Sequence, residues 1–202
     1  TMVAPSGVKT TGQTYELDMR MNFAVPAMPK KTGKEVAKLG QVAGEIIRES
    51  GVNRGVCVVY GFGSGELGYE LAMQSDLVVF GFDDNRDRVN KARKWLYGKG
   101  VYGSRVSVRY VESLEELPVT GNIANLLVSE TMLSGEDCPG NALEMNRLLR
   151  PGGGVAFLGK PAGSKQGVSA QRIVDWLKKH DVKNTRLGGG EWFKVTPGPL
   201  AD

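Results

Sequence analysis

The sequence contains few residues of the kinds that build metal sites or disulfide frameworks. Only two cysteines, Cys57 and Cys138, and one histidine, His180, occur among its 202 residues. Two cysteines are too few for a disulfide scaffold, and no Cys/His pair has the spacing of zinc ligands. Cys57 falls inside an apolar run, where a thiol usually acts as a small buried hydrophobic group. We therefore expect neither a disulfide-based fold nor a metal centre.

Long apolar segments and a strong charge imbalance are also missing. No uncharged apolar run approaches the roughly 20 residues of a membrane-spanning helix. The first residues show no basic region followed by an apolar stretch, so no targeting segment is visible and we expect a cytoplasmic protein by default. The 26 basic and 22 acidic residues are spread along the chain, with a net charge of +4. Nucleic-acid-binding proteins more often concentrate basic residues in one stripe, so we expect neither a membrane nor a clear nucleic-acid partner.

The composition is otherwise that of a folded domain, with 41% hydrophobic and 24% charged residues and an unusually large number of glycines, 28. Residues 1–33 contain prolines and glycines without a sustained period, which predicts an N-terminal arm. Beyond residue 33 no internal linker or repeat interrupts the pattern. The sequence therefore predicts one domain over residues 34–197, followed by a short tail, 198–202.

Within this domain, short apolar runs alternate with segments of helical periodicity. The runs predict strands at 56–60, 77–82, 105–111, 123–129 and 155–158. The periodic segments predict helices at 34–50, 66–74, 86–98, 141–149 and 168–179. Residues 183–187 and 191–195, separated by three glycines, predict a hairpin. This alternation predicts an α/β fold with a doubly wound, mostly parallel sheet and an antiparallel strand at its C-terminal side.

The most informative segment is Gly61-Phe62-Gly63-Ser64-Gly65, between the first predicted strand and its helix. Glycines let the backbone turn sharply and approach a ligand closely, although a tight turn alone would explain them equally well. The N–H groups at the start of the following helix favour polar or anionic ligand atoms. In open α/β sheets, ligands bind at the carboxyl ends of the strands. The loop is therefore a candidate binding site.

Two acids follow the second predicted strand, Asp83 and Asp84. A carboxylate at this place can accept hydrogen bonds from the vicinal hydroxyls of an adenosine ribose. We expect Asp83 to do so, and we expect Asp84, beside it in the candidate site, to cap the next helix; both could instead simply begin that helix. Nicotinamide dinucleotides prefer Gly-x-Gly-x-x-Gly, whereas here the third glycine comes one position early and Glu66 takes its place. Because a carboxylate repels a pyrophosphate, a cofactor without phosphates fits better.

The glycine-rich loop, the segment Gly81-Phe82-Asp83 and the stretch 144–153 (EMNRLLRPGG) together resemble class I S-adenosylmethionine-dependent methyltransferases over residues 34–195. The resemblance implies a seven-stranded sheet whose last strand is antiparallel, and S-adenosylmethionine as cofactor with S-adenosylhomocysteine as product. It also implies roles for particular residues. Methionine contacts would come from Gly61, Phe62, Gly63 and Gly65, ribose contacts from Asp83, adenine contacts from Glu112 and Ser113, and Ser129 would line the methyl-transfer centre.

The chain departs from the family's pattern at several positions. Val59 and Asn125 stand where most or many members have an acid, and Ser129-Glu130-Thr131-Met132 follows the fourth predicted strand in place of the motif of base-methylating enzymes. Glu112 could be a solvated loop acid and Ser129 a strand-end hydroxyl bonded to backbone. Glu130 could act as a base, but an exposed loop carboxylate is the simpler interpretation. No catalytic residue is identified.

Three functional hypotheses follow. The first is methyl transfer to an unidentified acceptor, a small molecule or another partner. The second is a cofactor-binding or structural module without activity, and the third, disfavoured by the glycine spacing, is an NAD(P)-dependent oxidoreductase. The segment 188–200 (GGGEWFKVTPGPL) also resembles the end of a methyltransferase-like domain in bacterial, planctomycete-type proteins, where it precedes a pyrroloquinoline-quinone-type β-propeller. That resemblance implies that the domain belongs to a larger chain.

Overall fold

The computed structural model describes residues 34–187 and 191–197, and their side chains from residue 38 onward. The predicted arm, the predicted tail and the three glycines of the hairpin lie outside the described residues. The helices are α1 (Lys34–Ser50), α2 (Glu66–Gln74), α3 (Arg86–Gly98), α4 (Glu130–Ser134), α5 (Ala142–Leu148) and α6 (Ala170–Lys178). The strands are β1 (Arg54–Tyr60), β2 (Asp76–Asp83), β3 (Val106–Tyr110), β4 (Leu126–Val128), β5 (Val155–Lys160), β6 (Thr185–Leu187) and β7 (Glu191–Val195).

The seven strands form one mixed sheet in the order β3-β2-β1-β4-β5-β7-β6. Strands β1 to β5 run parallel to one another, whereas β7 pairs antiparallel with both β5 and β6. The prediction of a seven-stranded, mostly parallel sheet with an antiparallel C-terminal strand is therefore confirmed. The strand order reverses between β1 and β4, so the loops that follow these two strands meet at one edge of the sheet.

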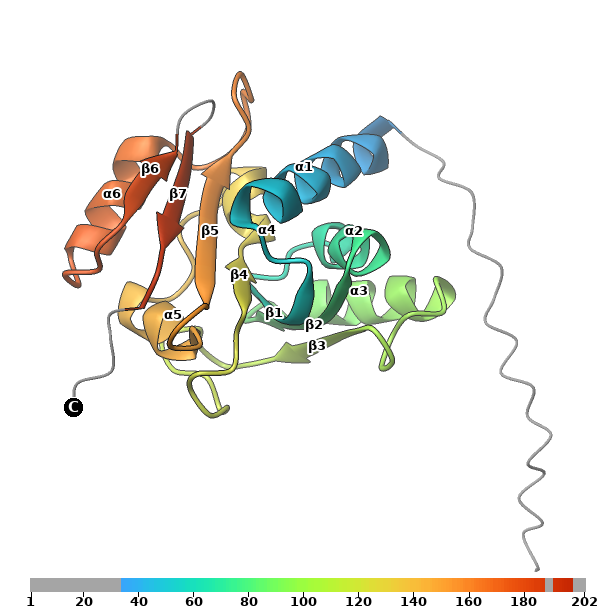
Figure 1. Ribbon diagram of the computed structural model, residues 1–202. Coiled ribbons are helices and arrows are strands. Elements are labelled where there is room, and N and C mark those ends of the chain that lie inside the picture. The colour runs from blue at the N-terminus through green and yellow to red at the C-terminus, as the bar shows by residue number, and fades with distance from the viewer. Residues whose placement is uncertain (1–33, 188–190, 198–202) are drawn as a thin grey trace, which may run out of the picture.

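Helices cover the sheet on both faces, as Figure 1 shows. Apolar side chains of α1, α2 and α3 pack on one face around Cys57, Val59 and Val79, and those of α5 and α6 pack on the other around Val58 and Leu127. Strands buried on both faces account for the uninterrupted apolar runs in the sequence. Cys57 is fully buried, which confirms its interpretation as a hydrophobic core residue. Among the described helices, none is both long and apolar enough to cross a membrane.

Two elements near the switch point differ from the sequence prediction. Strand β4 is shorter than 123–129, because Ile123 and Ala124 donate their N–H groups to the carbonyl of Leu148 before the chain joins the sheet. A short helix that the sequence analysis missed, α4, begins directly after β4 and ends at Gly135, which has a φ of 89°. This helix places residues 129–131 against the glycine-rich loop.

Candidate functional site

The glycine-rich loop joins β1 to α2 at the switch point of the sheet. Gly61, Gly63 and Gly65 have φ values of 78°, 65° and 90°, in the left-handed region that residues with a side chain rarely adopt. A Cβ atom at Gly63 would also lie 2.9 Å from Oε1 of Glu130. Glu130 of α4 thus fills part of the space above the loop. Position 63 requires glycine both for its left-handed backbone angle and for this close approach of Glu130.

Phe62 contributes to the core of the protein and not to the site. Its side chain is fully buried and packs in the cluster beneath α2 and α3. A Cβ atom on Gly81 of β2 would overlap the Phe62 ring, and one on Gly68 would lie 2.9 Å from it. The predicted contact of Phe62 with a methionine moiety could therefore come only from its backbone.

Asp83 ends β2 and is completely buried. Its Oδ2 accepts a hydrogen bond from the N–H of Gly63 (3.0 Å), and its Oδ1 accepts bonds from the N–H of Asn85 (2.9 Å) and from Nε of Arg88 (3.0 Å). The glycine-rich loop and the acid after β2, which the sequence separates by twenty positions, form one hydrogen-bonded unit. This arrangement supports Asp83 as part of the candidate site.

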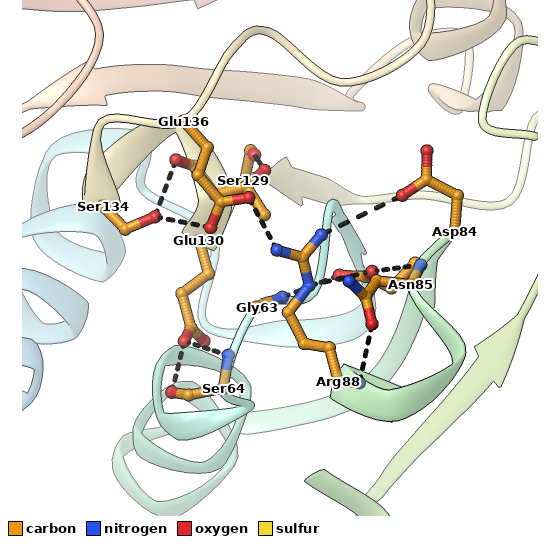
Figure 2. Close-up of polar contacts among 11 residues, drawn as sticks. Gly63, Ser64, Asp84, Asn85, Arg88, Ser129, Glu130, Ser134 and Glu136 are labelled. Carbon is orange, nitrogen blue, oxygen red and sulfur yellow. Dashed lines mark hydrogen bonds and ion pairs between the residues drawn. The ribbon is translucent and has the colours of Figure 1, made fainter. Parts of the chain in front are cut away.

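Arg88 belongs to α3 and extends across the site. Figure 2 shows its guanidinium between the end of β2 and the loop that follows α4. Its Nη1 lies 2.6 Å from Oε2 of Glu136, and its Nη2 lies 3.9 Å from Oδ1 of Asp84. The three nitrogens of this side chain thus contact three different carboxylates. Arg88 is about one quarter exposed, whereas Asp83 is not exposed at all.

The prediction that Asp84 caps α3 is wrong. The N-cap residue is Asn85, whose Oδ1 accepts a hydrogen bond from the N–H of Arg88. Asp84 is exposed and makes one long ion pair with Arg88. The side chain of an N-cap residue accepts a hydrogen bond from the N–H two or three residues further along the chain. Because α3 begins at Arg86, the N-cap position falls on Asn85 and not on Asp84.

Ser129 and Glu130 follow β4 and begin α4. The Ser129 hydroxyl accepts a hydrogen bond from the N–H of Met132 as the N-cap of this helix, and it lies 3.0 Å from the hydroxyl of Thr131. Ser129 is therefore a buried helix cap beside the loop, next to the carbonyl of Gly61, which accepts bonds from the N–H groups of Glu130 and Thr131. Its predicted role at the methyl-transfer centre stays a prediction.

Glu130 is buried, so its interpretation as an exposed loop carboxylate is wrong. Its Oε1 accepts hydrogen bonds from the N–H (2.8 Å) and the hydroxyl (2.5 Å) of Ser64, and its Oε2 accepts one from the N–H of Leu67 (2.9 Å). It thereby caps α2, whose own N-cap residue is a glycine without a side chain. Burial raises the pKa of Glu130 to about 7, a shift that these hydrogen bonds oppose and the neighbouring Glu66 increases.

A cavity of about 840 Å³ opens over the loop between α1, α3 and α4, within the usual size range of small-molecule sites. Its polar wall includes Gly63, Ser64, Asn85 and Arg88, and its apolar wall includes Leu39, Val42, Trp95 and Leu133. The carboxylate of Asp83 lies behind the polar wall, bonded to three of its residues, Gly63, Asn85 and Arg88. The cavity therefore adjoins the predicted ribose acid and the predicted loop.

Glu112 and Ser113 follow β3 and are exposed, and neither lines this cavity. The Ser113 hydroxyl accepts a bond from the N–H of Glu115, which gives it a local role. Their predicted adenine contacts stay predictions. Within residues 34–187 and 191–197, no three Cys, His, Asp or Glu side chains are placed to hold a metal ion.

Two features of the site, the position of Arg88 and the burial of Glu130, were not predicted from the sequence. Arg88 had a signal, because it stands in the first turn of a predicted helix, four residues after Asp84, a spacing at which opposite charges can pair. The α4 helix also had one, since a serine N-cap at Ser129 and a glycine stop at Gly135 bracket it. The contacts of Glu130 with Ser64 and Leu67 had none, because they join residues more than sixty positions apart.

Comparison with known proteins agrees with this architecture. A family model described as a methyltransferase domain matches residues 58–185. Among solved structures, a proposed S-adenosylmethionine-dependent methyltransferase from Methanococcus maripaludis has a TM-score of 0.67 at 20% identity, over 83% of this chain and 89% of that one. An S-adenosylmethionine-dependent methyltransferase from Aquifex aeolicus has a TM-score of 0.57 at 17% identity, over 82% of this chain and 97% of that one.

The fold alone does not show methyl transfer. The [4+2]-cyclase SpnF also shares it, with a TM-score of 0.56 and 16% identity over 72% of this chain and 58% of that one. None of the curated proteins matches the sequence, and none of the comparisons supports a β-propeller context. The family model, in contrast, spans well over half of the chain, and its range includes the glycine-rich loop, Asp83 and α4. The chain belongs to the class I S-adenosylmethionine-dependent methyltransferase domains.

Proposed function

We propose that this domain binds S-adenosylmethionine at the cavity over the glycine-rich loop and transfers its methyl group to an acceptor. The observation that supports this most strongly is the bond between the Gly63 N–H and the buried carboxylate of Asp83. It holds the acid expected to bind the ribose and the glycine-rich loop at the same wall of a cavity of suitable size. Family membership independently implies use of this cofactor.

Asp83 would accept hydrogen bonds from the ribose hydroxyls, and the backbone of Gly61, Gly63 and Gly65 would approach the methionine part. When bound, S-adenosylmethionine supplies a methyl group that is already activated by its sulfonium. The apolar side chains of Leu39 and Leu133 would keep water from this end of the cavity. The chain's contribution is then alignment and exclusion of water, which can supply much of the rate for such a transfer.

The acceptor is not identified, and we assign no catalytic base. Glu130 lines the cavity, but its carboxylate already accepts three hydrogen bonds from Ser64 and Leu67. A base has to be free to accept the acceptor's proton. The site therefore fits best an acceptor that is nucleophilic without a general base. This acceptor could be a small molecule or a part of a larger assembly.

A module that binds the cofactor without transferring its methyl group is the second candidate. The carbonyl of Gly61 accepts bonds from the N–H groups of Glu130 and Thr131, so this polar group of the loop is satisfied within the chain. Asn125, in place of a frequent acid, accepts a bond from the N–H of Val56 and therefore serves the sheet. These internal contacts favour a structural role for part of the site.

An oxidoreductase that uses NAD(P) is the least supported candidate. Glu66 is the first residue of α2 and lines the cavity. Its carboxylate would stand at the helix N-terminus where a pyrophosphate would bind, and two like charges at this distance repel each other. A cofactor without phosphates avoids this conflict.

Calorimetric titration with S-adenosylmethionine, S-adenosylhomocysteine and NADH distinguishes the candidates. We expect the first two to bind and NADH not to bind. Replacement of Asp83→Asn keeps the shape of the side chain but removes its charge and one acceptor oxygen, so affinity for S-adenosylhomocysteine should fall about 10- to 100-fold.

The matched control is Asp76→Asn, the same change at the exposed opposite end of β2, which should leave the affinity unchanged. Equal binding by the Asp83→Asn variant would remove the site assignment. Absence of binding by both adenosyl ligands would overturn the proposed function, and binding of NADH alone would favour the oxidoreductase.

A further inference from the structure

The proposed function does not account for the ion pair between Arg88 and the buried Asp83. The Nε atom of Arg88 donates to Oδ1 of Asp83 at 3.0 Å, while Oδ1 also accepts a bond from the N–H of Asn85. A carboxylate oxygen accepts about two hydrogen bonds. Oδ1 is therefore fully engaged, whereas Oδ2, which accepts only the N–H of Gly63, keeps one acceptor position. Two vicinal hydroxyls could each reach their own carboxylate oxygen only after Arg88 has left Oδ1.

We propose that Arg88 is an internal competitor for the cofactor: its guanidinium occupies the ribose acceptor Asp83, and its release sets the affinity of the site. This inference rests on the proposed function, because it concerns the same cavity. The contacts of the three guanidinium nitrogens of Arg88 support this proposal. Only Nε contacts Asp83, while Nη1 and Nη2 contact Glu136 and Asp84.

The ion pairs of Arg88 with Glu136 and Asp84 lower the free-energy cost of moving Arg88 away from Asp83. Glu136 lies in the loop after α4 and Asp84 at the start of the β2–α3 turn, and both are about half exposed. Because these two carboxylates lie beside the guanidinium, an Arg88 side chain that leaves Asp83 still has anionic partners close by. Figure 2 shows this arrangement, with the guanidinium between Glu136 and Asp84.

Replacing Arg88 should therefore tighten binding of the cofactor. Loss of a residue that supports binding would weaken it. The Arg88→Met variant keeps an unbranched side chain that reaches about as far as Nε of arginine, but it has no charge and no donor. We expect it to bind S-adenosylhomocysteine about tenfold more tightly than the wild type, the size expected for one charge-assisted hydrogen bond. Arg88→Gln, which keeps a neutral donor, should lie between the two.

Lys94→Met is the matched control, because it makes the same change of charge on an exposed part of α3 and should alter the affinity less than twofold. A second readout needs no variant. Arg88 is partly exposed, so salt should screen its ion pairs. The wild type should then bind S-adenosylhomocysteine about two- to threefold more tightly in 0.5 M than in 0.05 M salt, whereas Arg88→Met should show no such gain.

Titration calorimetry of all four proteins tests the proposal. Equal or weaker binding by Arg88→Met would overturn it while leaving the proposed function intact, provided that the wild type binds. Binding by Arg88→Met alone would support both. If neither protein binds S-adenosylmethionine or S-adenosylhomocysteine, the proposed function fails and this inference fails with it. Should Arg88→Met not fold, an affinity of the wild type that falls with added salt would likewise overturn the proposal.

Discussion

Replacement of Phe62 by alanine is expected to lower the free energy of unfolding by about 3–5 kcal/mol. The ring is fully buried between β2 and the helices α2 and α3, so its removal leaves a cavity in the core. Gly81→Ala should also destabilise the protein, by about 1–3 kcal/mol, because a Cβ atom there would overlap the ring. Urea unfolding measures both effects.

The pair also tests why a glycine stands in the middle of a buried strand. If Gly81 exists to accommodate the ring, the methyl group of Gly81→Ala should partly fill the cavity of Phe62→Ala. The double variant should then be more stable than the sum of the single effects implies, with a coupling of about 1–2 kcal/mol. Strictly additive effects would show that the two residues do not depend on each other.

The second large effect expected is a dependence of stability on the ionisation of Glu130. Burial raises its pKa to about 7 in the folded protein, from an ordinary value of 4.5, so the folded state binds a proton more tightly than the unfolded state. Stability should therefore fall as the pH rises from about 4.5 to about 7 and level off above that. A difference of this size corresponds to about 3 kcal/mol.

Urea unfolding of the wild type and Glu130→Gln at several pH values between 5 and 8 measures this contribution. Glutamine cannot ionise but keeps one oxygen to accept a bond from the loop. The wild type should lose stability relative to Glu130→Gln as the pH rises, whereas Glu112→Gln, a change at an exposed carboxylate, should follow the wild type. A constant difference between wild type and Glu130→Gln at every pH would contradict the prediction.

The same carboxylate links this pH dependence to the candidate site. Glu130 holds Ser64 and Leu67 at the start of α2 while its own N–H bonds to the carbonyl of Gly61. The glycine-rich loop is thus held from both ends by one residue of α4. Its conformation is determined by the chain itself, whatever ligand the cavity takes.

Much of the site was predictable because its signals are local. A glycine at three positions of a loop between a strand and a helix reflects backbone angles that the structure confirms at Gly61, Gly63 and Gly65. An acid at the end of the second strand had to lie beside that loop, since the carboxyl ends of neighbouring parallel strands meet at one edge of a sheet. The bond from Gly63 to Asp83 shows that it does.

Other residues of the site depend on contacts between distant parts of the chain. Arg88 and Glu136 come from different elements and pair only because the fold brings α3 and the loop after α4 together at the cavity that both residues line. In the sequence, Glu130 is a polar residue after a predicted strand, with no sign that it is buried. It is buried because the glycine-rich loop lies against it, and this burial raises its pKa.

The sequence by itself determined the order of the strands and of every described helix except α4, the parallel sheet with its antiparallel end, and the position of the glycine-rich loop and of Asp83. These follow from periodicity, apolar run length and backbone freedom, which act over a few residues. Only the tertiary structure decided that Phe62 belongs to the core, that Asn85 and not Asp84 caps α3, and that Arg88 and Glu130 occupy polar groups of the site. The physical reason is that burial, hydrogen bonding and charge pairing depend on neighbours in space, which local patterns do not specify.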